Sequence, residues 1–109
     1  MGAFNTVCSH QVCQTCHTRV ELVIQFKYGD VWQHSYQVGD PLLWDRNNEG
    51  EPGHTLVVLD AIAEACPHCG TEGQEYEVYV AGDTITAVRP ASGAYDFATH
   101  HVSYLVLED

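Results

Sequence analysis

The segment CPHCGT at residues 66–71 repeats a pattern that first occurs as CQTCHT at residues 13–18. Each segment separates two cysteines by two residues, a spacing at which one short turn can direct both sulfurs at a single metal ion. Pro67 restrains the second turn, and Gly70 can adopt the positive φ that such turns often need. Because zinc prefers four tetrahedral ligands, we predict one metal site. Its ligands are Cys13, Cys16, Cys66 and Cys69.

Cys8 is the one cysteine outside the two pairs, and it lies five residues before Cys13. A C-x-x-C turn is a better chelate than this wider spacing, so Cys8 is expected to be a free, buried thiol. Two alternatives stay open. Cys8 could replace Cys13 or Cys16 as a ligand, or it could form a redox pair with one of them in the metal-free protein.

Histidines flank both cysteine pairs. His10, His17 and His68 are expected to lie beside the metal rather than bind it, with His17 as an alternative ligand. No second metal site is predicted at His100 and His101, because neighbouring residues of a strand point to opposite faces.

The two C-x-x-C knuckles and the hairpins expected after them resemble the zinc-ribbon group, in which two cysteine knuckles at the ends of β-hairpins clamp one zinc ion. This resemblance implies a structural Zn²⁺ held by the four cysteines. The CPHCG knuckle is also similar to that of rubredoxin, which implies iron as the alternative metal, although rubredoxin typically has Gly where this chain has His17. Many zinc ribbons bind nucleic acid or belong to the transcription machinery.

Runs of β-branched and aromatic residues predict a mostly β fold of antiparallel hairpins. Residues 20–28 and 31–38 are predicted to form the first hairpin. A three-residue loop at residues 28–30 gives it one apolar face, on which Phe26 lies opposite Trp32. His34 would then face the core as a hydrogen-bonded histidine of the sheet.

The second half of the chain predicts further strands. Residues 74–81 and 84–89 indicate a hairpin with a type II′ turn, which would place Val80 opposite Ile85 and Val78 opposite Ala87. We also predict a buried strand at residues 54–60 and a closing strand at residues 101–107. Between the two halves, residues 39–53 are rich in Gly, Pro, Asn and Asp and predict a long inserted loop within one domain, residues 1–109.

Acidic residues dominate the charge, with fifteen Asp and Glu against four Lys and Arg and a formal net charge of -11. Direct nucleic-acid binding is not expected, because it needs Lys and Arg to neutralise phosphates. The charge favours a basic protein partner, or else a solvated surface that keeps the chain soluble. No window is apolar enough for a membrane span, and the cysteine spacing favours a reducing, cytoplasmic location. The oligomeric state is left open.

Four thiolates close the coordination sphere of a metal, so the site is expected to be structural and the chain non-enzymatic. The predicted function is a zinc-stabilised acidic interaction module, of immunity, antitoxin or complex-adaptor type, that binds a basic protein. The alternatives are a rubredoxin-like iron electron-transfer protein and a zinc-ribbon subunit of a nucleic-acid-processing assembly. The predicted partner surface lies in the long loop, although its apolar side chains could instead fold back as core. It consists of Leu42, Leu43, Trp44 and Asp45.

Overall fold

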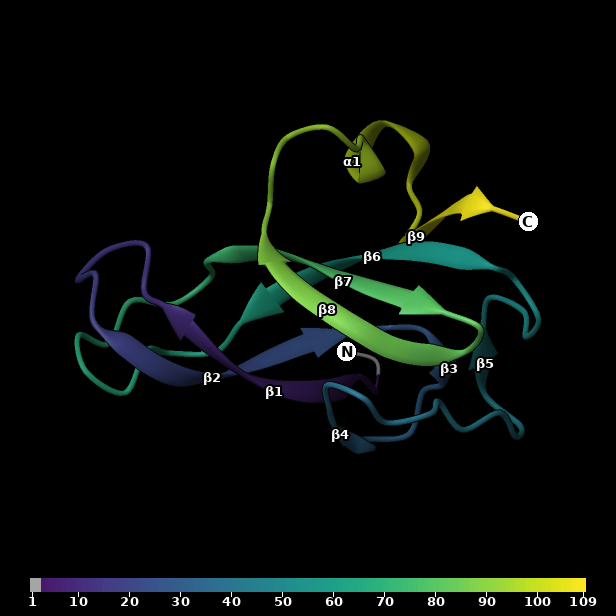
Figure 1. Cartoon of the computed structure of the whole chain (residues 1–109), viewed down its shortest axis with the longest axis horizontal. Helices are drawn as coiled ribbons and strands as arrows, with labels where there is room; N and C mark the ends of the chain where they lie inside the picture. Colours follow the sequence, from purple (N-terminus) through teal and green to yellow (C-terminus); the bar gives the residue numbers. More distant parts are fainter. Residues whose placement is uncertain (1–2) are drawn as a thin grey trace.

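Over residues 3–109, which the computed structural model describes, the chain forms nine β-strands and one short helix (Figure 1). The predicted mostly β, antiparallel fold is therefore confirmed. No helix in this part of the chain is long and apolar enough to cross a membrane. The elements are β1 (Asn5–Val12), β2 (Arg19–Phe26), β3 (Gly29–Asp30), β4 (Ser35–Gln37), β5 (Asn48–Glu49), β6 (Leu56–Ala63), β7 (Glu75–Ala81), β8 (Thr84–Pro90), α1 (Phe97–His100) and β9 (Tyr104–Glu108).

Seven of the strands form one curled sheet in the order β4-β1-β2-β6-β7-β8, and β9 also pairs with β6. All pairs are antiparallel except β1 with β4. After β4 the chain crosses to the opposite end of the sheet, where the Gly39 N–H donates to the Ile85 carbonyl (2.7 Å) and the Leu42 N–H donates to the Asp83 carbonyl (2.8 Å). The start of the predicted long loop thus ties the two ends of the sheet together.

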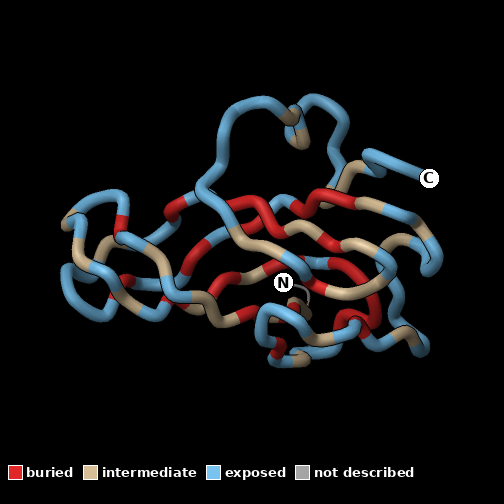
Figure 2. The backbone as a smooth tube through the Cα atoms, viewed as in Figure 1, coloured by how far each residue is buried: buried red, intermediate tan, exposed pale blue. Residues whose placement is uncertain are grey.

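The curled sheet encloses one contiguous apolar core, visible as the buried parts of the strands in Figure 2. β6 contributes most continuously, because Val57, Val58 and Leu59 are all buried before the strand begins to alternate. This confirms the predicted buried strand, which extends further than expected, to Ala63. The largest completely buried side chains include Tyr28, Tyr76, Leu22, Ile24 and Ile85.

The predicted first hairpin is wrong. β2 pairs with β1 over its whole length and with β6 at its end, whereas residues 31–34 form no strand. Trp32 does not face Phe26 but is 66 % exposed. The reason is visible in β1, whose inward positions carry polar residues at Asn5, Ser9 and Gln11, so its sequence does not show the apolar alternation of a half-buried strand.

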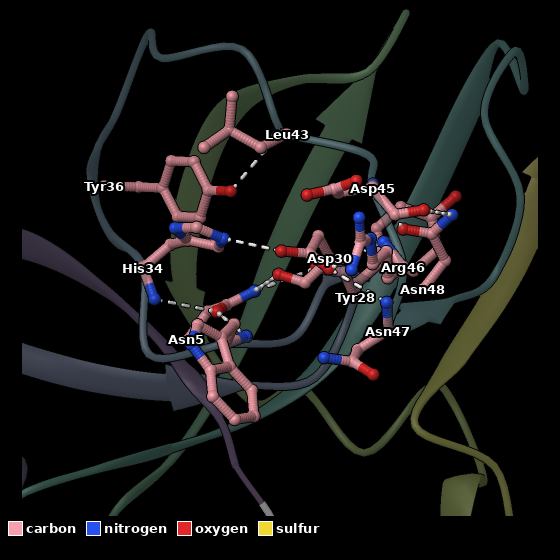
Figure 3. Close-up of polar contacts among 11 residues, drawn as sticks. Asn5, Tyr28, Asp30, His34, Tyr36, Leu43, Asp45, Arg46, Asn47 and Asn48 are labelled. Atoms are coloured by element: carbon pink, nitrogen blue, oxygen red, sulfur yellow. Dashed lines mark hydrogen bonds and ion pairs between the residues drawn. The ribbon is translucent and has the colours of Figure 1, made fainter.

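Asn5 organises the segment that was expected to form the hairpin (Figure 3). Its side chain is completely buried. The Nδ2 group donates to the carbonyls of Tyr28 (3.2 Å) and Asp30 (3.0 Å), and Oδ1 accepts from the N–H groups of Trp32 (3.3 Å) and His34 (3.0 Å). One amide therefore satisfies four backbone groups, which removes the need for a partner strand here.

Asp30 continues this network toward the long loop (Figure 3). One carboxylate oxygen lies 2.8 Å from His34 Nε2, and the other accepts from the N–H groups of Asn47 (2.9 Å) and Arg46 (3.2 Å). His34, followed by these backbone donors, lowers the pKa of Asp30. The expected hydrogen bonding of His34 is thus present, but His34 is half-buried and lies outside the strands.

The second predicted hairpin is present as β7 and β8, with Val80 opposite Ile85. Gly82 and Asp83 both have positive φ, 55° and 63°, so the turn is of type I′ rather than II′. A bulge then shifts the register, and Val78 lies opposite Val88 instead of Ala87.

At the C-terminal end, the closing strand β9 begins later than predicted, at Tyr104. His100 ends α1, and His101 caps this helix in a left-handed conformation, so neither lies in a strand.

Candidate metal centre

Each cysteine pair lies in the turn of an antiparallel hairpin. The first turn joins β1 to β2, and the second joins β6 to β7. Because β2 pairs with β6, with Ile24 opposite Ala63, the two hairpins are neighbours in the sheet and their turns meet at one end of the molecule (Figure 1). Ligands far apart in the sequence are thereby brought together by strand pairing.

The two turns have the same pair of backbone hydrogen bonds, which gives the second knuckle the conformation of the first. These bonds are Cys13 N to Thr18 O (3.0 Å) and His17 N to Cys13 O (2.9 Å) in the first turn, and Cys66 N to Thr71 O (3.0 Å) and Gly70 N to Cys66 O (2.8 Å) in the second. In each turn the cysteine that begins the pair is buried, so its sulfur is directed inward.

The four sulfur atoms all lie within 4.8 Å of one another. The Sγ atoms of Cys13 and Cys69 are 3.7 Å apart, and those of Cys16 and Cys66 are 4.0 Å apart. A tetrahedral ion with metal–sulfur bonds of about 2.3 Å requires sulfur separations of about 3.8 Å. The four cysteines singled out from the sequence are therefore arranged to hold one metal ion.

Backbone amides point at the buried sulfurs. The N–H groups of Thr15 (3.4 Å) and Cys16 (3.5 Å) donate to Cys13 Sγ, and the His68 N–H donates to Cys66 Sγ (3.4 Å). The donors from Cys16 and Thr15 lower the pKa of the Cys13 thiol to about 6. Since metals bind the thiolate form, this turn is prepared for metal binding near neutral pH.

Gln74, which precedes β7, is a supporting residue that the sequence did not reveal. Its buried side chain lies against the metal centre, where Nε2 donates to Cys13 Sγ (3.4 Å) and Oε1 accepts from the Gln14 N–H (2.8 Å). Gln74 thus links the exit of the second knuckle to the first. A glutamine at the start of a strand has no local pattern that marks such a role.

Cys8 does not belong to the four-sulfur cluster. It lies in β1 opposite Val23 and is half-buried rather than fully buried. Burial, followed by the negative charges of Glu21 and Glu64, raises the pKa of its thiol. Cys8 is a free thiol that stays protonated at neutral pH.

The residues predicted to contact a partner have different environments. Leu42 is buried in the core, so it is corrected from a surface residue to a core residue. Trp44 is half-buried and packs edge-on against Tyr28, with ring centroids 5.3 Å apart. Leu43 and Asp45 are exposed. The predicted surface is thereby reduced to Leu43, Asp45 and the exposed part of Trp44.

No known family model, curated protein or solved structure matches this chain. The likeness to zinc ribbons therefore rests on the two cysteine knuckles and their hairpins alone.

Proposed function

We propose that this chain is a non-enzymatic, zinc-stabilised acidic module that binds a basic protein partner. The observation that carries the proposal is the sulfur cluster. Four thiolates complete a tetrahedral coordination sphere and leave no position for a substrate or for a reactive water. The metal would serve to fasten the β1–β2 hairpin to the β6–β7 hairpin.

A structural metal suits a chain of this size. With 109 residues, the domain buries only a small core, which contributes limited stability. A cross-link between its hairpins would add to that stability. Residues 13–16 and 66–69 both lie in connections between strands. Zinc would hold these connections together without redox chemistry, in a reducing compartment such as the cytoplasm.

The basic character of the partner is inferred from the net charge of this chain. A net charge of -11 creates a negative field that attracts basic proteins and accelerates their association. Such a surface suits a protein of immunity or antitoxin type, or an adaptor in a complex, since these act by binding another protein.

Two measurements test the proposal. Elemental analysis of the purified protein should give one zinc per chain, and chelation should lower the melting temperature. Affinity capture from the native host should retain basic proteins that salt releases, because the attraction is electrostatic. Captured proteins that are acidic, or that stay bound at high salt, would count against a basic partner.

Iron is the second candidate for the same four sulfurs, since tetrahedral sulfur sites accept either metal. Cys69 is exposed, which would allow an electron to leave the site, and the N–H donors to Cys13 and Cys66 would tune a reduction potential. A red protein with visible absorption would favour this electron-transfer function, whereas a colourless one would favour zinc.

A further inference from the structure

The outer face of the sheet carries an exposed isoleucine, Ile62, near the end of the interior strand β6. From Asp60 onward β6 alternates, so that Ala61 and Ala63 are buried while Asp60 and Ile62 are exposed. Ile62 is 48 % exposed and lies between Gln25 of β2 and Glu75 of β7. A single exposed aliphatic residue is ordinary on a protein surface, so Ile62 gains significance only from the hollows beside it.

Two neighbouring hollows flank Ile62. The first, of about 450 Å³, is lined by Phe4 and Ile62, whereas Phe26 and Ala61, which also border it, have side chains buried in the core. The second, of about 600 Å³, extends toward the second cysteine knuckle and shares Gln25 and Ile62 with the first. Volumes of this size accommodate one or more side chains of a bound segment. We call this surface, with its acidic rim described next, the Ile62 groove.

Carboxylates surround the Ile62 groove. Asp60 lines the first hollow, Glu64 and Glu72 line the second, and Glu75 lies opposite Ile62 on β7. Lys27 is the only Lys or Arg among the residues that line the two hollows, all within the described part of the chain. The apolar centre is therefore bordered almost entirely by negative charge.

Some of these carboxylates repel one another in the folded protein. Asp60 and Glu75 lie on the neighbouring strands β6 and β7, near enough for their charges to interact. Burial, followed by the charge of Glu75, raises the pKa of Asp60. A bound cation at this position would relieve the repulsion.

We propose that the Ile62 groove is the docking site for a basic segment of the protein partner. An apolar side chain of that segment would occupy the hollow beside Ile62, and its Lys or Arg residues would pair with Asp60, Glu64 and Glu75. Charge disfavours a second copy of this chain as the occupant, because it would bring a further net charge of -11 to an acidic surface. The assignment rests on the proposed function, which supplies the basic partner.

The test uses short random peptides displayed on phage and selected against the intact, metal-loaded chain at physiological ionic strength. We expect the enriched peptides to be basic, with at least one large apolar residue. Their affinity should fall about tenfold or more for Ile62→Arg, which blocks the hollow and repels cations. Val38→Arg is the matched control, because this substitution adds the same charge away from the groove. Val38 is 46 % exposed in the turn after β4.

A second variant tests the groove independently, in case Ile62→Arg fails to fold. Glu75→Lys reverses one rim charge without touching the apolar hollow, and Glu51→Lys reverses an exposed charge in the long loop as its control. Binding that falls for Glu75→Lys and not for Glu51→Lys supports the Ile62 groove. Basic peptides that bind all four variants equally would overturn this groove but leave the proposed function standing, whereas enrichment of non-basic peptides would overturn both.

Discussion

His17 and Gly70 occupy equivalent positions in the two cysteine turns, and both have positive φ, 58° and 78°. Each N–H donates to the carbonyl of the cysteine that begins its pair. Glycine adopts this conformation without steric cost, whereas a residue with a Cβ is strained in it by about 1–2 kcal/mol. The first knuckle therefore stores strain that the second one avoids.

We expect His17→Gly to stabilise the metal-loaded protein by up to about 1 kcal/mol, since the relief of strain is partly offset by the greater flexibility of glycine in the unfolded chain. Gly70→Ala is the reciprocal variant and should destabilise by about 1 kcal/mol through φ alone, because a Cβ at Gly70 meets no atom within 4 Å. Urea unfolding measures both. If His17→Gly lowers stability, the His17 side chain makes a contact that outweighs its strain.

Substitution of single cysteines should distinguish the four cluster cysteines, which bind the metal, from Cys8, which does not. Cys66→Ser is expected to reduce metal affinity by more than the roughly 100-fold that loss of a supporting hydrogen bond can cause, and to lower the melting temperature sharply. Cys8→Ser is the control and should leave one metal per chain. Competition with a chromophoric chelator measures the affinity. A full metal complement in Cys66→Ser would show that another group replaces this ligand.

Gln74→Leu tests the hydrogen bond to the metal centre. The variant removes the N–H donor to Cys13 Sγ and leaves the Gln14 N–H without its acceptor. We expect metal affinity to fall about 10- to 100-fold and metal release to a chelator to accelerate. Gln37→Leu, at an exposed position of β4, is the control. Equal release rates for the two variants would mean that Gln74 only fills space.

The sulfur cluster could be predicted because its signal is local. Two C-x-x-C turns identify the ligands whatever the strands between them do, and Gly82 with Asp83 marks the β7–β8 hairpin in the same way. The bulge that shifts Val78 is not local in this sense, since a two-residue turn sets only the first pairs of a register.

β1 could not be predicted because its inward face is polar. Asn5 uses its whole amide to hold residues 28–34, and Gln11 Nε2 donates to Ser9 Oγ (2.9 Å) and to the Val88 carbonyl of β8 (3.0 Å). These contacts are specific to the tertiary structure and have no period in the sequence. The alternating β-branched and aromatic residues at 31–38 consequently suggested a hairpin, which Asn5 makes unnecessary.

Truncation of the two tryptophans should change the stability of the protein by very different amounts. Trp44 packs on Tyr28 at the edge of the core, so Trp44→Ala is expected to destabilise the protein by about 2 kcal/mol. Trp32 is mostly exposed, and Trp32→Ala should change stability by less than about 0.5 kcal/mol. Thermal unfolding compares the two. Equal losses would show that Trp32 packs in solution, as the hairpin prediction required.

Asp30 should account for part of the loss of folding stability at acid pH. Its pKa is lowered in the folded protein by His34 and by the N–H groups of Asn47 and Arg46. A lowered pKa means that the ionised form stabilises the fold above the unfolded value of about 3.9, and that this contribution is lost as the pH falls through the folded pKa. Asp30→Asn should therefore lower stability at neutral pH and flatten the acid limb of the stability profile.

Urea unfolding midpoints, measured from neutral pH down to the acid limb, provide the comparison for Asp30→Asn. Asp45→Asn is the matched control, because Asp45 is exposed in the same loop region and should leave the acid limb unchanged. His34→Gln extends the test, since the neutral amide of glutamine can keep a hydrogen bond to Asp30 and carries no charge at any pH. If Asp30→Asn keeps the wild-type acid slope, the network in Figure 3 does not control unfolding in acid.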